Sequence, residues 1–172
     1  IEVNGLLFFA ADDGVNDREL WKSNGTAAGT EMVKDIHPNG NSITGLSHFL
    51  GVNDILFFTA IDGITGTELW KTDGSTAGTI LVKDIYPGMA HSIPGLFTEL
   101  NGILFFAANN GTNGYELWKS DGTSTGTVLV KDIFPGNSGS ITASPIGSNG
   151  ALFFAANDST HGPELWQSDG TA

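Results

Sequence analysis

Short runs of hydrophobic residues alternate with stretches rich in Gly, Asn, Asp and Thr along the whole chain. In the third copy of this pattern, Asn101-Gly102 is typical of a two-residue hairpin turn, because both residues tolerate positive φ angles. The strands predicted after this turn cover 103–108, 116–120, 127–133 and a segment between 140 and 148. No window shows the 3.6-residue spacing of an amphipathic helix. The pattern therefore predicts an all-β chain with four strands in each unit.

The pattern is an internal repeat, which has to be identified before any fold is assigned. Trp recurs at spacings of 49, 48 and 48 residues, at Trp21, Trp70, Trp118 and Trp166. A Phe pair precedes each Trp, and a Lys-Asp-Ile segment follows the first three. These spacings predict one array over 1–172, built of units at 4–52, 53–100, 101–148 and an incomplete 149–172.

The first strand of each unit decides between architectures. The run 103–108 is hydrophobic at every position, which is typical of a strand that is buried on both faces. Neighbouring blades of a β-propeller cover a four-stranded antiparallel sheet in this way. We therefore predict tandem four-stranded antiparallel units of about 48 residues in a β-propeller-like fold. The alternatives are a β-trefoil, which closes after three units although a fourth has begun here, and a linear β array.

The segment 116–123, Glu-Leu-Trp-Lys-Ser-Asp-Gly-Thr, resembles the bacterial E-L-W-x-x-D-G-T repeat family. The resemblance extends through Lys131-Asp132-Ile133 and recurs in the other units, with departures at Asn24 and Met32 in the first. It implies large bacterial proteins that are secreted or attached to the cell surface and are built from many such units. It implies no established enzymatic activity.

Composition narrows the possible partners. Seven Lys and Arg stand against nineteen Asp and Glu, for a formal net charge of −12, which argues against nucleic acid and against anionic membranes. The chain has no Cys, so disulfides and thiolate chemistry are excluded. No hydrophobic run approaches the length of a membrane-spanning helix. Polysaccharide or cation binding remains compatible with this charge.

No catalytic motif is present in the sequence. The four His residues occupy different repeat positions, and there is no H-E-x-x-H, P-loop or G-x-S-x-G sequence. The recurring Trp residues are interpreted as core residues rather than sugar-stacking platforms. The turn residues Asn24, Asp73, Asp121 and Asp169 are interpreted as structural, because Asp and Asn accept hydrogen bonds from N–H groups two residues later. We predict that the chain is not an enzyme and requires no cofactor.

The loops of the repeat contain two kinds of candidate modification or ligand site. In the loops that precede Glu-Leu-Trp, carboxylate oxygens suit Ca²⁺, and the candidate ligands are Asp12, Asp13, Asp17, Asp62 and Asp158. The N-glycosylation triplet occurs at Asn24, Asn110 and Asn157, all in predicted loops.

The Glu-Leu-Trp strand is predicted to pair with the Lys-Asp-Ile strand. Counting back from Ser23 opposite Thr30 places Trp21 opposite Met32 and Glu19 opposite Lys34. The same count gives the Trp–Leu pairs 70–81 and 118–129, and the Glu–Lys pairs Glu68–Lys83 and Glu116–Lys131. Cross-strand pairs of this kind contribute about 0.2–1 kcal/mol each.

Together these features predict a non-enzymatic extracellular or cell-surface repeat scaffold, structural or adhesive. The alternatives are a carbohydrate-binding propeller with one shallow site per repeat and a Ca²⁺-stabilised surface module. The sequence starts without Met, and residues 1–3 align with the end of a fourth strand. It stops just after the Asp-Gly-Thr turn of the fourth unit. We expect that it does not close on itself, that Leu165 and Trp166 lie on an exposed edge, and that further repeats or head-to-tail copies complete it.

Overall fold

A computed structural model describes residues 1–45 and 47–171, which form fifteen strands and no helix. No helix long and apolar enough to cross a membrane occurs among these residues. The strands group into four antiparallel sheets. The first two sheets contain β1 (Glu2–Val3), β2 (Leu6–Asp12), β3 (Arg18–Ser23) and β4 (Glu31–Lys34), then β5 (Phe49–Val52), β6 (Ile55–Ile61), β7 (Thr67–Thr72) and β8 (Ile80–Lys83). The last two contain β9 (Gly95–Leu100), β10 (Ile103–Asn109), β11 (Tyr115–Ser120) and β12 (Val128–Lys131), then β13 (Ile146–Ser148), β14 (Ala151–Asn157) and β15 (Pro163–Ser168).

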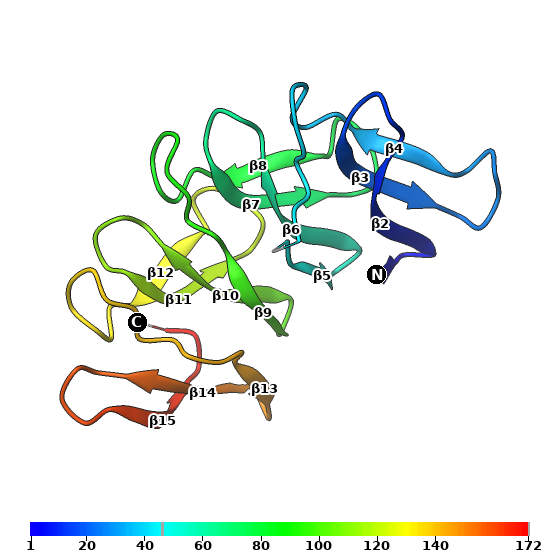
Figure 1. Cartoon of the computed structure of the whole chain (residues 1–172). Coiled ribbons are helices and arrows are strands. Elements are labelled where there is room, and N and C mark those ends of the chain that lie inside the picture. The colour runs from blue at the N-terminus through cyan, green and yellow to red at the C-terminus, as the bar shows by residue number, and fades with distance from the viewer. Residues whose placement is uncertain (46, 172) are drawn as a thin grey trace.

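The sheets follow one another like the blades of an open propeller (Figure 1). The first strands of successive sheets lie along one side of the array, where β9 is next to both β5 and β13. The all-β, propeller-like architecture predicted from the repeats is therefore confirmed.

Each complete sheet combines strands from two sequence repeats. The strand that ends one repeat pairs with the first hydrophobic strand of the next, as β9 does with β10. The turn between them is Asn101-Gly102, with φ angles of 53° and 77°, as the sequence predicts. β1 pairs with β2 in the same way, which confirms the alignment of 1–3 with a fourth strand. The boundaries of the sheets are therefore shifted by one strand relative to the boundaries of the sequence repeats.

The hydrophobic core consists of three clusters, each lying between two neighbouring sheets. Side chains alternate along a strand, so the two Phe of each pair face opposite neighbours. Phe57 packs toward the third sheet and Phe58 toward the first. Burial on both faces, predicted for the first strand of every repeat, holds for β6 and β10. In β2 and β14, which belong to the outermost sheets, one face is only partly covered.

The Glu-Leu-Trp strand pairs with the predicted partner strand, and the predicted register is correct for the Trp pairs but wrong for the Glu–Lys pairs. Trp21 lies opposite Met32, Trp70 opposite Leu81 and Trp118 opposite Leu129. The Glu–Lys pairs are wrong, because Leu20, and not Glu19, lies opposite Lys34. A bulge adds Val33 to the strand and puts its side chain into the core, which moves Lys34 off the face that Glu19 occupies. The same bulge separates Glu68 from Lys83 and Glu116 from Lys131.

Candidate functional site: the junction between sheets

The repeated residues meet where one sheet packs on the next, and each such contact region is called a junction here. Trp70 packs toward the first sheet, with Phe8, Leu20 and Val33 in the same cluster. Trp118 makes the equivalent contact with the second sheet. Both Trp side chains are 6% exposed. Trp21 has no sheet on that side and is half-buried.

Trp166 differs from the sequence-based expectation of an exposed edge residue. It is partly buried against the third sheet, and its Nε1 donates a hydrogen bond to the Ala156 oxygen at 3.1 Å. Leu165, on the opposite face of β15, is 78% exposed as predicted. The edge is therefore exposed on one face only, because alternation along β15 turns neighbouring side chains to opposite sides.

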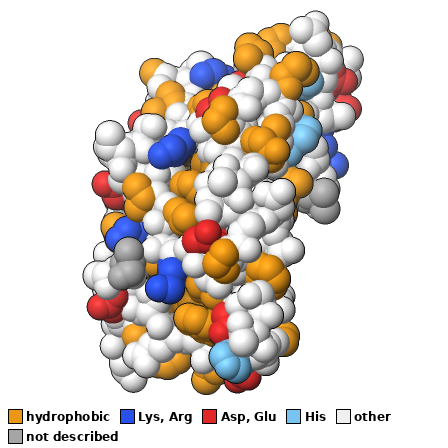
Figure 2. Space-filling model, turned by 90° about the vertical axis from the view of Figure 1, so that its left-hand side faces the viewer, with side chains coloured by type: hydrophobic (Ala, Val, Ile, Leu, Met, Phe, Trp, Pro, Cys, Tyr) orange, Lys and Arg blue, Asp and Glu red, His pale blue; other side chains and the backbone are white. Residues whose placement is uncertain are grey.

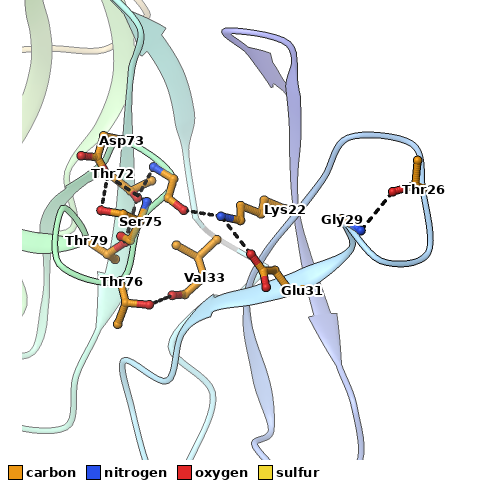
Figure 3. Close-up of polar contacts among 11 residues, drawn as sticks. Lys22, Thr26, Gly29, Glu31, Val33, Thr72, Asp73, Ser75, Thr76 and Thr79 are labelled. Atoms are coloured by element: carbon orange, nitrogen blue, oxygen red, sulfur yellow. Dashed lines mark hydrogen bonds and ion pairs between the residues drawn. The ribbon is translucent and has the colours of Figure 1, made fainter.

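A Lys that directly follows Trp connects the first sheet to the second and the third sheet to the fourth. Lys22 Nζ donates to the Gly74 oxygen at 2.8 Å and lies 3.1 Å from Glu31 Oε1 (Figure 3). Lys119 Nζ donates to the Gly170 oxygen at 2.6 Å. In both cases the acceptor belongs to the Asp-Gly-Thr turn, or its Asp-Gly-Ser variant, in the following sheet. The ammonium group thus satisfies a turn carbonyl across the junction.

The Lys of Lys-Asp-Ile makes a second connection across the same junction. Lys34 Nζ donates to the Thr79 oxygen at 2.8 Å and lies 6.0 Å from the centroid of the Trp70 ring. Lys83 Nζ donates to the Thr127 oxygen at 2.8 Å. Lys131 is exposed on the third sheet. Hydrogen bonds from charged donors are worth more than neutral ones, about 1.5–3 kcal/mol when shielded from water.

The acceptor turns are held by the structural hydrogen bonds expected of Asp and Asn. Asp73 Oδ1 accepts from the Ser75 nitrogen at 2.8 Å and from Ser75 Oγ at 2.6 Å (Figure 3). The hydrogen bonds from the Ser75 hydroxyl and the Ser75 nitrogen lower the pKa of Asp73, and the Lys22 ammonium adds a smaller effect in the same direction. Asn24, Asp121 and Asp169 make the same contacts with Thr26, Thr123 and Thr171. A Cβ at Gly78 would lie 2.1 Å from Asp73 Oδ1, so the turn requires glycine there.

The Glu of Glu-Leu-Trp is buried and holds the segment that crosses to the next sheet. Glu68 accepts hydrogen bonds from the nitrogens of Ile85, Tyr86 and Ser92, at 2.9, 3.4 and 3.1 Å. Ser92 Oγ donates to Glu68 Oε2 at 2.5 Å. We call this arrangement the Glu clamp. Its other copies are centred on Glu19 with Ser42 and on Glu116 with Ser140.

Burial dominates the electrostatics of the Glu clamp. It raises the pKa of Glu68 to about 7, although the hydrogen bonds from Ser92 and Ile85 act in the opposite direction. Burial raises the pKa of Glu19 and Glu116 as well. Glu164 occupies the same repeat position but is exposed. A carboxyl group with a raised pKa is a feature of many catalytic sites, but here its partners are backbone N–H groups and a Ser hydroxyl of the fold itself.

The loops with candidate Ca²⁺ ligands use their carboxylates to close turns. Asp13 accepts from the nitrogens of Val15 and Asn16, and these bonds, that to Asn16 first, lower its pKa. Asp12 accepts from the Gly14 nitrogen, Asp62 from those of Ile64 and Thr65, and Asp158 from that of Thr160. Asp17 lies in the same loop as Asp12 with a positive φ of 55°. Within 1–45 and 47–171, no three His, Cys, Asp or Glu side chains gather as metal ligands would.

The Asn residues of the glycosylation triplets also take part in turns. Asn24 Oδ1 accepts from Thr26, Asn110 Oδ1 from the nitrogens of Thr112 and Asn113, and Asn157 Oδ1 from the Ser159 nitrogen. Asn24 is exposed, whereas Asn110 and Asn157 are half-buried. Glycosylation at these positions stays a prediction.

A cleft opens between neighbouring sheets at the end that carries the turns. Between the second and third sheets its volume is about 80 Å³, and Asn53, Phe57, Lys71 and Asp121 are among its lining residues. Between the third and fourth sheets the equivalent cleft, with Asn101, Phe105, Lys119 and Asp169, has a volume of about 420 Å³. A hydrophobic ring, an ammonium and a carboxylate therefore recur together. In Figure 2, Lys and Arg side chains appear as separate spots among acidic and hydrophobic ones, and not as one basic patch.

Comparisons with known proteins bear on the fold. No protein-family model and no curated protein matches the sequence. The chain is similar to puromycin hydrolase, with a TM-score of 0.58 and 15% identity over 96% of this chain and 26% of that chain. It is also similar to a mutant of puromycin hydrolase in complex with PGG, with a TM-score of 0.56 and 14% identity over 94% of this chain and 25% of that one. The chain thus spans about a quarter of those proteins, and at this identity the likeness concerns the propeller-like fold alone.

Two groups of junction residues were not assigned a role from the sequence. Lys22, Lys71 and Lys119 recur directly after Trp, but the acceptors of Lys22 and Lys119 lie 52 and 51 residues away. Ser42, Ser92 and Ser140 recur as Ser-Ile pairs at a spacing close to that of Trp. This recurrence is a signal that could have identified the serines as partners of a repeated residue.

Proposed function

We propose that the chain is a non-enzymatic repeat scaffold with a structural or adhesive role outside the bacterial cell. The observation that carries this proposal is the use made of the repeated polar side chains. Each recurring Glu, Lys and Asp with a buried or bridging position bonds the backbone of its own or the next sheet. Packing of one sheet on the next therefore explains why these residues are repeated, because every junction uses the same hydrogen-bonding side chains.

The extracellular location is supported by the resemblance to the E-L-W-x-x-D-G-T family, whose members are secreted or surface-attached. A negative net charge and the absence of Cys are compatible with it. We expect an epitope-tagged protein, expressed in its bacterial source, to be digested by protease added to intact cells. Protection of the tag in intact cells, together with its digestion after lysis, would contradict an extracellular role.

The scaffold role predicts that the junction lysines contribute to stability. Substitution of Lys119 by Met removes the bond to the Gly170 oxygen while keeping most of the hydrophobic stem. We expect the free energy of unfolding to fall by about 1 kcal/mol in urea titrations followed by Trp fluorescence. Lys131→Met, at an exposed Lys on the same sheet, is the control. Equal stability of both variants would show that the Lys119 bond does not hold the junction.

Carbohydrate binding is a second candidate, favoured by the cleft between the third and fourth sheets. Its volume of about 420 Å³ lies in the range of small-molecule sites, and Lys119 and Asp169 offer a donor and an acceptor to sugar hydroxyl groups. The equivalent cleft of about 80 Å³ between the second and third sheets is below that range. One site per repeat is thus less favoured than a single site at the wider cleft.

Glycan-array screening followed by calorimetric titration separates the two functions. A scaffold should show no saturable sugar binding at millimolar concentration and no turnover of peptide, ester or glycoside substrates. Saturable binding that Asp169→Asn abolishes, and that Asp158→Asn in the β14–β15 loop leaves intact, would establish the carbohydrate-binding alternative. Turnover of any substrate class would instead refute the non-enzymatic role.

A further inference from the structure

Asn-Gly pairs are sites where the backbone of a protein can react with a side chain of its own. The Gly nitrogen attacks the Asn Cγ atom, and glycine favours this attack because it has no Cβ that would hinder the approach. The nitrogen must first give up its hydrogen. Where the N–H group donates a hydrogen bond in the folded protein, that bond has to be broken before the attack, and the pair reacts more slowly.

The chain has seven Asn-Gly pairs, and hydrogen bonds hold most of them. In the pairs that begin at residues 4, 24, 39, 101 and 110, the Gly nitrogen donates at 2.6–3.0 Å to Glu2 Oε1, Ser23 Oγ, the His37 oxygen, Glu99 Oε1 and Asn109 Oδ1, respectively. In a sixth pair, Asn113-Gly114, the side-chain amide is held on both sides. Asn113 Nδ2 donates to Asp132 Oδ2 at 2.7 Å, and its Oδ1 accepts from Asn110 Nδ2 at 2.8 Å.

The seventh pair, Asn149-Gly150, has neither kind of hydrogen bond. Within residues 1–45 and 47–171, no hydrogen bond involves the Gly150 nitrogen or the Asn149 side chain. Both residues are exposed, and a Cβ at Gly150 would meet no atom within 4 Å. The nitrogen and the side-chain amide that have to meet are therefore both unbonded, and there is space around them.

The hairpin of the third sheet shows that one residue causes this difference. Asn101-Gly102 has φ angles of 53° and 77°, and Asn149-Gly150 has φ angles of 50° and 76°, so the two turns share a backbone conformation. Glu99 precedes the first turn and accepts from the Gly102 nitrogen at 2.6 Å. The equivalent residue of the fourth sheet is Gly147, which has no side chain that could accept a hydrogen bond. The difference therefore arises within the hairpin itself.

We propose that Asn149 is a site of spontaneous deamidation through a succinimide. The Gly150 nitrogen forms a bond to Asn149 Cγ, the Cγ–Nδ2 bond breaks, and ammonia leaves with the hydrogen of the former N–H group. Water then opens the ring at either carbonyl carbon and yields aspartate or isoaspartate. Both products carry a carboxylate in place of the neutral amide, and isoaspartate adds a methylene group to the backbone of the β13–β14 turn. The reaction requires only water, so it goes beyond the scaffold role and does not depend on it.

Incubation of the full chain in buffer, with peptide mass spectrometry at successive times, measures the reaction at each Asn. Conversion of amide to carboxyl should be roughly tenfold faster in the Asn149 peptide than in the Asn101 peptide, because the Gly102 nitrogen must first break its bond to a charged acceptor. In urea that unfolds the chain, the two rates should be similar, because each Asn is followed by Gly. Equal rates in the folded protein, or a faster reaction at Asn101, would overturn the proposal.

Two substitutions of Glu99 test whether its carboxylate is the cause. Glu99→Ala removes the acceptor and should raise the rate at Asn101 toward that at Asn149, while the rate at Asn149 stays the same. Glu99→Gln keeps an acceptor oxygen on a side chain of the same length and is the matched control, in which Asn101 should remain slow. Circular dichroism confirms that both variants are folded. An Asn101 rate that is the same in Glu99→Ala as in the wild type would also overturn the proposal.

Discussion

Replacement of Glu68 by Gln tests whether burial of a carboxyl group governs the Glu clamp. The amide has the size of the carboxyl group but does not titrate. Burial raises the folded-state pKa of Glu68 from the ordinary 4.5 to about 7. Between these values the folded protein binds more protons than the unfolded chain, so the contribution of this group is full below pH 4.5 and is lost as the pH rises through 7.

The size of the effect follows from the shift. At 1.36 kcal/mol for each pKa unit, the loss between pH 5 and pH 8 is about 2–3 kcal/mol in the wild type and absent in the variant. The free energy of unfolding of the wild type, minus that of Glu68→Gln, should therefore fall by about this amount over that range. All other groups titrate in both proteins and cancel in the difference.

Urea unfolding followed by Trp fluorescence at pH 5, 6, 7 and 8 measures this difference. Glu164→Gln makes the same substitution at the same repeat position on the surface, and serves as the control. A difference between wild type and Glu68→Gln that stays constant from pH 5 to pH 8 would refute the reasoning. It would mean that the hydrogen bonds from Ile85, Tyr86 and Ser92 offset the desolvation cost of the ionised Glu68 carboxylate.

Two further substitutions test the turns and the core with matched controls. Gly78→Ala should lower the free energy of unfolding by about 1–3 kcal/mol, because its Cβ would lie 2.1 Å from Asp73 Oδ1. Gly45→Ala, whose Cβ would have no atom within 4 Å, should leave the free energy of unfolding unchanged. Equal urea midpoints for the two variants would contradict this account. Phe58→Ala should lower the free energy of unfolding by about 3–5 kcal/mol, because the ring is fully buried between sheets. Phe9→Ala, at the same repeat position on the half-buried outer face of the first sheet, should lower it much less. Similar losses in the two variants would show that burial between sheets is not the cause.

Local chemistry in the sequence was enough to predict the strands and turns. The Asn101-Gly102 hairpin and the Asp73 turn depend on residues within a few positions of one another, and the structure contains both. The same strand and turn residues recur in the other three units, and this repetition made it possible to predict the propeller-like arrangement. Burial of β10 on both faces followed from the uninterrupted hydrophobic run 103–108, and β6 keeps this pattern except at Thr59.

The partners of the polar repeat residues were decided by the tertiary structure. Pairing by count assigned Lys34 to Glu19, but packing favours Val33 in the core, and the resulting bulge turns the two side chains apart. Glu19 then bonds the crossing segment, and Lys34 reaches the Thr79 oxygen of the next sheet. A strand pattern specifies alternation within one sheet, whereas the Lys contacts depend on how the next sheet, 45 to 52 residues further along the chain, packs against it.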